Sequence, residues 1–329
     1  MRPHNAPVRA LPSGAAAWWQ FAALALFVAV APAALASTAY LNLLTLAGIW
    51  GVAAVGVSLL AGLGGQFTFG QAGLVSVGAY ASAVVTVQHG GHPLLGVLAG
   101  IAIAVAVALA TAPILRLRGW YLALATLALG HLVLHLEVTL TSVTKGNDGI
   151  SGIPPLGAFG VTLDDETAFF VAGWSLVGLC MLLARNLAAS RFGRAARAVQ
   201  ADEDAARAQG VPALRYKTAM WVLAAAMAAL SGSLYAHYSQ FVSPADFGVD
   251  HSITLFVAVL LGGSRSVFGT LVALAFLLSL PELGGALSTP LLTALALMAV
   301  YALSPAGLAG LAERAAAAVR RVSRRPGHA

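Results

Sequence analysis

Long apolar runs follow one another along almost the whole chain, and this pattern constrains the fold more than any other feature. A helix that spans a bilayer needs about 20 mostly apolar residues. Runs that reach or approach this length lie at residues 17–36, 39–61, 67–88, 93–115, 119–140, 168–185, 216–238, 247–262, 267–283 and 286–303. We therefore predict an all-α fold, a polytopic transmembrane helical bundle of about eight to ten spans.

The scarcity of charge supports the same class. Only 9% of the residues are charged and 59% are hydrophobic, with a mean hydropathy of +0.86. A soluble globular protein carries about 25% charged residues, so this composition excludes a soluble domain of this size. The single cysteine, Cys180, excludes a disulfide framework and a metal site built from several cysteines.

The basic residues predict an orientation. If the N-terminus is cytoplasmic and each run crosses once, all 18 lysines and arginines except Lys145 fall on the cytoplasmic side. Lysine and arginine bias sets the orientation of membrane proteins. We predict a cytoplasmic N-terminal segment at 1–16, a transmembrane domain at 17–303 and a basic cytoplasmic tail at 304–329, which places both termini in the cytoplasm.

Two details of this topology stay open. Residues 247–283 form either two spans or one re-entrant hairpin, and neither choice changes the sidedness of the other spans. The tripeptide Ala34-Leu-Ala36 also fits a signal-peptide cleavage site, although the length of the first run favours an uncleaved span.

The stretch "GLGGQFTFGQAG" (62–73) interrupts the apolar runs with five glycines and two glutamines. It lacks the spacing of a phosphate-binding loop. Glycines can serve close helix packing, but buried amides in a membrane need partners or a water-lined cavity. A second break, "GGSRSVFG" (262–269), echoes the first, and paired breaks indicate a substrate path. The candidate residues of a path or gate are Gly64, Gly65, Gln66, Thr68, Gly70, Gln71, Tyr80, Tyr121, Thr126, Gly262 and Gly263.

Three ionisable residues lie within or near the span at 119–140. His131 and His135 share a helix face, but two histidines make an incomplete metal shell, so we predict hydrogen-bonding or interface roles and no metal site. Glu137 is expected to reach the outer membrane interface. The chain also lacks Walker-A, H-E-x-x-H and G-x-S-x-G patterns, so we predict no catalytic residues and no enzyme activity.

The largest cytoplasmic insert, residues 186–215, is rich in alanine and predicts a helix over 191–209. Phe192, Ala195, Val199 and Ala206 form its apolar face, Glu203 and Arg207 are spaced for an ion pair, and Gly210 with Pro212 ends it. A short amphipathic helix between two spans suits docking onto a soluble partner. The alternative is a solvated loop that contacts only lipid headgroups.

Five segments in order resemble the branched-chain amino acid ABC transporter permease family of the LivH/LivM type. They are "GQFTFGQAGLVSVGAYAS" (65–82), "RLRGWYLALATLALG" (116–130), "TSVTKGNDGISGIP" (141–154), "SRFGRAARAVQADEDAARAQGV" (190–211) and "LLGGSRSVFGTLVAL" (260–274). The chain departs from the family at Lys145, where a glycine is usual, and at His131, where an acidic residue is frequent.

The resemblance implies a permease subunit of an ABC importer for branched-chain or related amino acids, in a bacterial inner membrane. It implies a second homologous permease subunit, two ATP-binding subunits that use the ATP, and an extracytoplasmic solute-binding protein. The chain itself would bind no cofactor and no nucleic acid, and would contact membrane lipid. The insert would be the cytoplasmic coupling helix, with Arg191, Phe192, Gly193, Arg194, Glu203, Asp204, Ala205, Ala206 and Gly210 coupling to the ATPase.

Two other functions remain as alternatives. An ion-coupled secondary transporter of small solutes would need an ionisable site near the midplane, and the sequence offers only Glu137 and Glu282, both near proposed span ends. A structural membrane subunit would have no solute path of its own.

Overall fold

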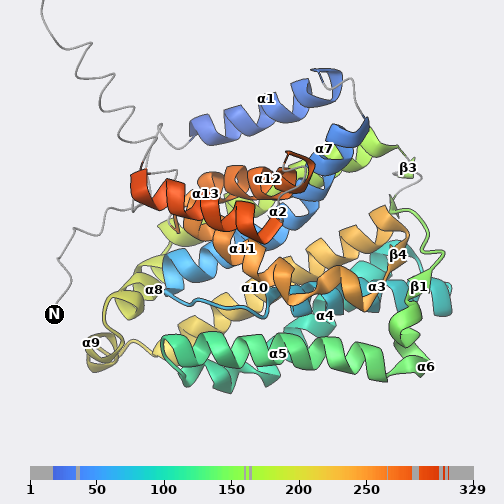
Figure 1. Cartoon of the computed structure of the whole chain (residues 1–329). Helices are drawn as coiled ribbons and strands as arrows, with labels where there is room; N and C mark the ends of the chain where they lie inside the picture. The colour runs from blue at the N-terminus through green and yellow to red at the C-terminus, as the bar shows by residue number, and fades with distance from the viewer. Residues whose placement is uncertain are drawn as a thin grey trace, which may run out of the picture.

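The computed structural model of the chain is a bundle of helices that run between two ends (Figure 1). It describes residues 18–34, 38–158, 161–162, 165–264, 266–283, 289–303, 307 and 310. One end carries helices α8 (Arg191–Ala201) and α9 (Glu203–Ala208), and the other carries the strands β1 (Ile150–Ser151) and β4 (Phe241–Val242). They are termed the α8–α9 end and the β1–β4 end. The segment 1–16, residues 35 and 36 of the candidate cleavage site and nearly all of the tail at 304–329 lie outside the described residues.

Each predicted apolar run contains a helix, so the all-α polytopic prediction is confirmed. The long helices are α1 (Trp18–Ala34), α2 (Thr38–Gly64), α3 (Gln71–Ala83), α4 (Pro93–Ala110), α5 (Trp120–Thr139), α7 (Glu166–Ala189), α10 (Ala213–Ser239), α11 (Val249–Gly262), α12 (Val267–Leu283) and α13 (Thr289–Leu303). Among the described residues, six helices are long and apolar enough to cross a membrane, and α1 and α12 are shorter apolar helices. The chain is therefore a multi-pass membrane protein.

Short elements complete the two ends. They are η2 (Val84–Gln88), η3 (Ala112–Arg116), α6 (Thr141–Thr144), η4 (Gly146–Asp148), η5 (Pro244–Phe247) and the strands β2 (Gly157–Ala158) and β3 (Val161–Thr162). Strand β1 pairs antiparallel with β4, with Ile150 opposite Val242, and β2 pairs antiparallel with β3. The β1–β4 pair ties the loop after α6 to the end of α10.

Helices α2 and α10 form the centre of the bundle. Helix α10 packs against α2, α3 and α4, whereas α2 also packs against α7 and α12. Glycine permits the closest of these contacts, because a Cβ atom at Gly232 of α10 would overlap the carbonyl oxygen of Val75 in α3. A Cβ at Gly78 would likewise overlap the backbone of Ala229. Small residues let membrane helices approach closely, so this packing fixes the position of α3.

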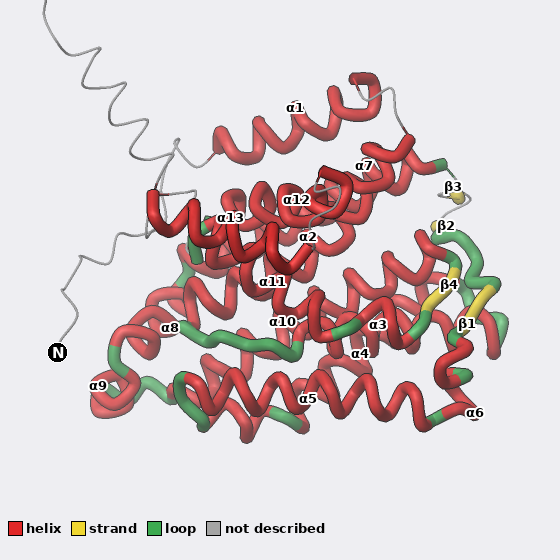
Figure 2. The backbone as a smooth tube through the Cα atoms, in the orientation of Figure 1, coloured by secondary structure: helices red, strands yellow, loops and turns green. Residues whose placement is uncertain are grey.

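The first glycine break is an extended segment rather than a bend within one helix. Helix α2 ends at Gly64, Gly65 has φ +60°, and α3 begins only at Gln71. Figure 2 shows the intervening loop in green, running along the bundle toward α3. The sequence is therefore right about the break, but the third helix starts later than residue 67 because glycine lets the chain leave the helix at Gly65.

The second break has a different geometry. Helix α11 ends at Gly262, Gly263 has φ +94°, and α12 starts at Val267, so the two helices form a tight hairpin. A Cβ at Gly262 would overlap the backbone of Gly269. Together with η5, α11 forms the stretch Pro244–Gly262, which at 19 residues is one of the six long enough to cross a membrane.

The prediction of one continuous helix over 191–209 is wrong. The chain leaves the helix at Asp202 (φ −157°, ψ 107°), which separates α8 from α9. The Asp202 carboxylate accepts hydrogen bonds from the N–H groups of Asp204 and Ala205, both at 3.0 Å, and so caps α9. Aspartate is a preferred N-cap residue. Asp202 therefore starts a new helix here instead of continuing α8. Gly210, with φ +79°, ends α9 as predicted.

Candidate functional site

The apolar face predicted for the coupling segment packs against its own chain. Val199 and Ala206 are buried with Ala213, and the rings of Phe192 and Tyr216 lie 5.1 Å apart. Gly193 is also buried, since a Cβ there would overlap the carbonyl oxygen of Ala188. The predicted coupling residues that stay exposed are Arg191, Arg194, Asp204, Ala205 and Gly210. A soluble partner would therefore meet this polar face, not the apolar one.

Glu203 joins three parts of the chain at the α8–α9 end. Its carboxylate lies 2.6 Å from Arg207 Nη2, 2.6 Å from Lys217 Nζ and 3.2 Å from Arg118 Nε. The side chains of Glu203 and Lys217 are only 11% and 9% exposed. The ion pair with Arg207 was predicted. The contacts with Lys217 and Arg118 were not predicted, because both residues lie at least 14 positions from Glu203 in the sequence.

Arg118 also binds Asp204 through two hydrogen bonds. Its Nη2 and Nη1 atoms donate to Asp204 Oδ1 at 2.8 Å and to Oδ2 at 3.1 Å. These hydrogen bonds, and then the nearby charges, lower the pKa of Asp204 and raise the pKa of Arg118. Both side chains are exposed, so solvent screens this pair and its contribution to stability is modest.

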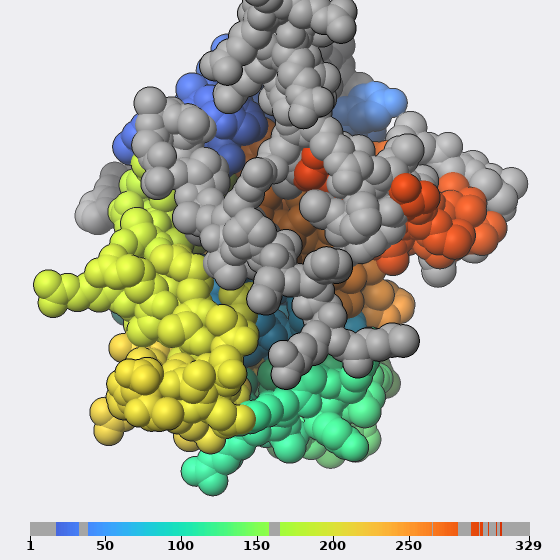
Figure 3. Space-filling model, turned by 90° about the vertical axis from the view of Figure 1, so that its left-hand side faces the viewer, coloured from blue at the N-terminus to red at the C-terminus, as the bar shows by residue number. Residues whose placement is uncertain are grey.

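A cleft of about 260 Å³ lies between the coupling segment and the first glycine break. We term it the α8–α9 cleft. Gly64, Gly65 and Gln66 form one wall, the junction of α8 and α9 forms the opposite wall, and the loop at 117–119 and Lys217 close the sides. Figure 3 views this end of the molecule, where the yellow α8–α9 region lies beside the green start of α5.

The two walls of this cleft touch. The Nε2 atom of Gln200 donates to the carbonyl oxygen of Ala61 at 3.4 Å, and a Cβ at Gly65 would lie 2.9 Å from Gln200 Cγ. Gln200 therefore places α8 in direct contact with the end of α2 and with the break.

Polar side chains line the break inside the bundle. Gln66, Thr68 and Gln71 are at most 2% exposed, and their side-chain N and O atoms have no hydrogen-bond partner among the described residues. An unpaired buried polar group costs about 1–3 kcal/mol. Such groups are tolerated inside a membrane protein where they line a cavity. This arrangement fits a solute path that is closed in this structure.

Helices α5 and α11 hold the break in place. The N–H of Phe69 donates to Thr126 Oγ1 at 3.1 Å, and the N–H of Ala72 donates to Ser252 Oγ at 2.9 Å. A Cβ at Gly70 would crowd the carbonyl oxygen of Thr126 at 2.5 Å, so only glycine fits there without a shift. Ser252 has no signal in the sequence that links it to the break.

Most of the predicted path residues lie together, but four do not lie at the break. Gly64, Gly65, Gln66, Thr68, Gly70, Gln71 and Thr126 meet at the break. Tyr80 lies further along α3, and Gly262 and Gly263 form the α11–α12 turn. Tyr121 is 75% exposed at the start of α5, away from the buried polar residues of the break.

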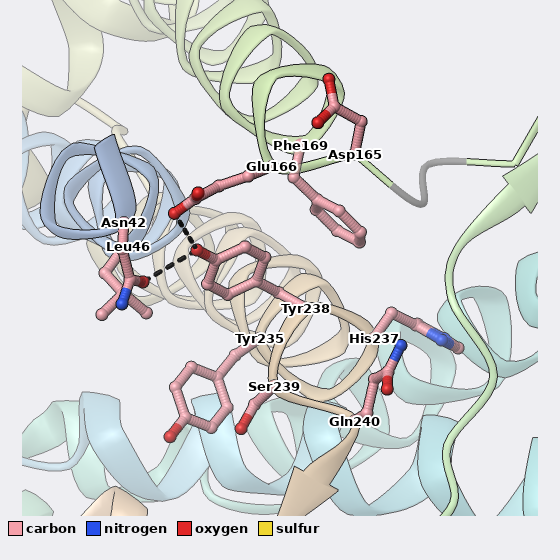
Figure 4. A pocket seen from close by; sticks show the side chains of 10 residues that line it. All are labelled: Asn42, Leu46, Asp165, Glu166, Phe169, Tyr235, His237, Tyr238, Ser239 and Gln240. Carbon is pink, nitrogen blue, oxygen red and sulfur yellow. Dashed lines mark hydrogen bonds between the residues drawn. The ribbon is translucent and has the colours of Figure 1, made fainter. Parts of the chain in front are cut away.

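A second cleft, of about 490 Å³, opens at the β1–β4 end between α2, α7 and α10. Figure 4 shows the hydroxyl of Tyr238 pointing toward Asn42 and Glu166, while the ring of Tyr235 points away from them. The Tyr238 hydroxyl donates to Asn42 Oδ1 at 2.8 Å and lies 3.5 Å from Glu166 Oε1. We term this the β1–β4 cleft. Its residues come from three separate helices, so no local sequence pattern predicts it.

The ionisable residues of α5 do not form a metal site. His131 and His135 are exposed, and no group of three or more histidine, cysteine, aspartate or glutamate side chains among the described residues could hold a metal ion. The expectation that Glu137 reaches the interface is wrong. Glu137 is 6% exposed, and its Oε1 atom lies 2.5 Å from Ser76 Oγ on α3.

Comparison with known proteins gives consistent matches. Residues 39–308 match the family described as branched-chain amino acid transport system / permease component. The chain is 31% identical over 284 residues to the high-affinity branched-chain amino acid transport system permease protein LivM of Salmonella typhimurium. This match covers 78% of this chain and 66% of that protein. It is 31% identical over 282 residues to the LivM protein of Escherichia coli, with the same coverage.

An archaeal relative matches over a shorter range. The chain is 27% identical over 214 residues to the probable branched-chain amino acid transport permease protein LivM of Methanocaldococcus jannaschii, covering 61% of this chain and 59% of that protein. The matched part thus spans just under two thirds of the length of these relatives. No solved structure matches the chain significantly.

Proposed function

Because the chain belongs to the branched-chain amino acid transport system permease family, we propose that it is the transmembrane permease subunit of an ABC importer. The importer moves branched-chain or related amino acids into the cell. This chain supplies the transmembrane path and is a transport subunit rather than an enzyme. ATP is hydrolysed by partner subunits.

The proposed assembly contains a second homologous permease subunit, two ATP-binding subunits and an extracytoplasmic solute-binding protein. The α8–α9 end faces the cytoplasm of a bacterial cell, and both termini lie there. The distribution of lysine and arginine supports this orientation. The exposed residues Arg191, Arg194, Asp204 and Ala205 then face the ATP-binding subunits.

The α8–α9 cleft carries the mechanistic proposal. One wall is the coupling segment, and the other wall is the start of the glycine break, which includes the buried Gln66. When the ATP-binding subunits change state, they shift α8 and α9, and the contact of Gln200 with Ala61 and Gly65 moves the break. The coupling is reciprocal, so solute in the path changes the affinity of the partner subunits for ATP by the same free energy.

Reconstituted transport tests the assignment. The chain, purified with its partner subunits and placed in liposomes, should take up labelled leucine, isoleucine or valine only with ATP and the solute-binding protein. Uptake should persist when ionophores remove all ion gradients. Uptake that follows an ion gradient without ATP would instead establish the secondary transporter, and the absence of any transport would favour a structural subunit.

Thiol accessibility tests the gate separately. In a Cys180→Ser background, the reaction of Gln66→Cys with a water-soluble thiol reagent should change by about tenfold between nucleotide-free and ATP-bound importer, which corresponds to a shift of about 1.4 kcal/mol in opening. Ser231→Cys is the matched control, since Ser231 is buried in α10, donates to the carbonyl oxygen of Ile49 and does not line the cleft, so it should not respond. Equal reactivity of Gln66→Cys in both states would contradict a gate at the break.

A further inference from the structure

Glu137 is a buried carboxylate with no positive partner. Its Oε1 atom is held by Ser76, but its Oε2 atom is buried without any hydrogen-bond partner. The ion pairs found among the described residues involve Glu203 and Asp204, and none involves Glu137. Charged groups inside a membrane protein are expensive and normally pair with an opposite charge or a hydrogen-bond donor, and the described residues supply no such partner for the free oxygen of Glu137.

The backbone fixes the position of this carboxylate. Helices α3 and α5 approach closely, because a Cβ at Gly73 would lie only 3.0 Å from the Cα of Gly130. The Thr144 hydroxyl donates to the carbonyl oxygen of Glu137 at 2.5 Å and holds the end of α5. Glu137 is therefore preorganised, with its carboxylate turned toward α3 rather than toward lipid.

Tyr80 adds a second unpartnered group. It follows Ser76 by one helical turn and so lies on the same face of α3. Its hydroxyl is buried without a hydrogen-bond partner, and it lies within electrostatic reach of Glu137. A free carboxylate oxygen and a free hydroxyl on adjoining helices can both accept hydrogen bonds from an ammonium group, which has three donors.

Aromatic rings separate these groups from the β1–β4 cleft. The ring of Phe247 lies 5.3 Å from Tyr235, 6.4 Å from Trp50 and 6.5 Å from Tyr80. Tyr235 also lines the β1–β4 cleft. These four residues are termed the ring cluster. Aromatic faces attract cations and also pack against aliphatic groups, so the cluster suits a molecule that carries both.

We propose that Glu137 binds the ammonium group of the transported solute and that the ring cluster contacts its apolar side chain. The solute class is a small aliphatic molecule with a primary ammonium group. This inference rests on the proposed function, in which such a molecule enters from the β1–β4 end. In this structure the ring of Phe247 packs between those of Tyr235, at the β1–β4 cleft, and Tyr80. Solute reaches the carboxylate when Tyr235 and Phe247 separate.

Ligand-dependent thermal stability tests the proposal without measuring transport. The full chain, purified in detergent with the subunits that accompany it but without solute-binding protein, is heated with L-leucine, with 3-methylbutylamine or with 4-methylpentanoate. The amine keeps the ammonium group and the acid lacks it. Binding to the folded state raises the Tm. We expect L-leucine and the amine to raise the Tm, and the acid to have no effect.

Variants assign the effect to the carboxylate. Glu137→Gln should raise the amine concentration needed for half of the Tm shift by about tenfold or more, because the buried ammonium group loses its counter-charge. Glu137→Asp should retain part of the response. Asp148→Asn, which removes an exposed carboxylate in η4 that lines neither cleft, is the control and should respond like the wild type. The Tm without ligand reports whether Glu137→Gln folds, and a response restored by Glu137→Asp excludes a general loss of structure.

Three results would overturn the proposal. They are an equal response of Glu137→Gln and wild type to the amine, an equal response of the wild type to amine and acid, and no response of the wild type to any of the three compounds. The proposed function has a separate readout, since ATP-driven uptake can fail while amine binding at Glu137 persists, and the reverse also holds.

Discussion

The guanidinium group of Arg118 holds the carboxylate of Asp204 at two points, although the residues lie 86 positions apart. The same guanidinium contacts Glu203 through Nε at 3.2 Å. Arg118 precedes α5, and α5 carries Thr126, which binds the glycine break. The coupling segment thus contacts the break by two routes, through Gln200 and through α5.

The buried contact between Glu203 and Lys217 predicts a clear mutational effect. Glu203→Gln leaves the ammonium group of Lys217 nearly buried without its counter-charge, and should lower the free energy of unfolding by about 2–3 kcal/mol. ATP-driven uptake should fall with it, because α9 loses its attachment to α10. Thermal unfolding and uptake measure the two effects. Asp204→Asn is the control, since its side chain is 71% exposed and its loss should lower the free energy of unfolding clearly less than the loss of Glu203 does. Equal losses in both variants would contradict this account.

Asp204 predicts a small dependence of stability on pH. Its pKa is lower in the folded chain than the ordinary value of about 3.9, because Arg118 hydrogen-bonds the ionised form. The stabilisation is therefore complete above about pH 5 and is lost as the pH falls through the lowered pKa. The Tm of the wild type should fall more steeply between about pH 5 and pH 3 than the Tm of Asp204→Asn. Arg118→Gln should behave like Asp204→Asn, and parallel curves for all three proteins would refute the pairing.

The contact between α3 and α10 predicts that Gly232 tolerates no side chain. Gly232→Ala would force the two helices apart and should cost about 1–3 kcal/mol or more, as overpacking does. The Tm and the yield of monodisperse protein report the loss. Gly173→Ala is the matched control in α7, because the nearest atoms to its added Cβ lie 3.9 Å away. That variant should be neutral or up to about 1 kcal/mol more stable, and an equal loss in both variants would argue against close packing as the cause.

The backbone conformation of Lys145 predicts that a glycine at this position would make the protein more stable. It has φ +63°, a conformation in which a side chain costs about 1–2 kcal/mol. Lys145→Gly relieves this strain, but glycine loses more conformational freedom on folding, which offsets part of the gain. The free energy of unfolding should therefore rise by about 0.5–1 kcal/mol. Lys145→Ala removes the charge but keeps a Cβ, so it should bring no gain. Denaturation in mixed micelles compares the three proteins, and a gain in Lys145→Ala would assign the effect to charge.

The sequence predicted the helices well because membrane backbone must satisfy its hydrogen bonds within each span. Apolar run length therefore locates the helices directly. The interruption at Asp202 between α8 and α9 could also have been predicted, because an aspartate followed by "EDAA" is a typical helix start. The sequence predicted the coupling helix as continuous because its alanine content outweighed this cap.

Contacts between distant residues were out of reach. Ser76 and Glu137 are 61 positions apart, and nothing in either local pattern indicates that α3 and α5 align at Gly73 and Gly130. The same holds for Lys217, which looks like an ordinary basic residue at the start of a span. Periodicity identifies which face of a helix is apolar, but not which helix covers it.

The non-helical backbone between Gly65 and Gly70 sets the length of the connection between α2 and α3. A residue in extended backbone advances about 3.3 Å, whereas a helical residue advances about 1.5 Å. Each residue of this segment that joins α2 or α3 therefore shortens the connection by about 1.8 Å. Two such residues would shorten it by about 3.6 Å. Because the backbone contacts of Gly78 and Gly232 hold α3 against α10, this shortening would draw the end of α2, with the Gln200 contact at Ala61, toward α3 rather than move α3 itself.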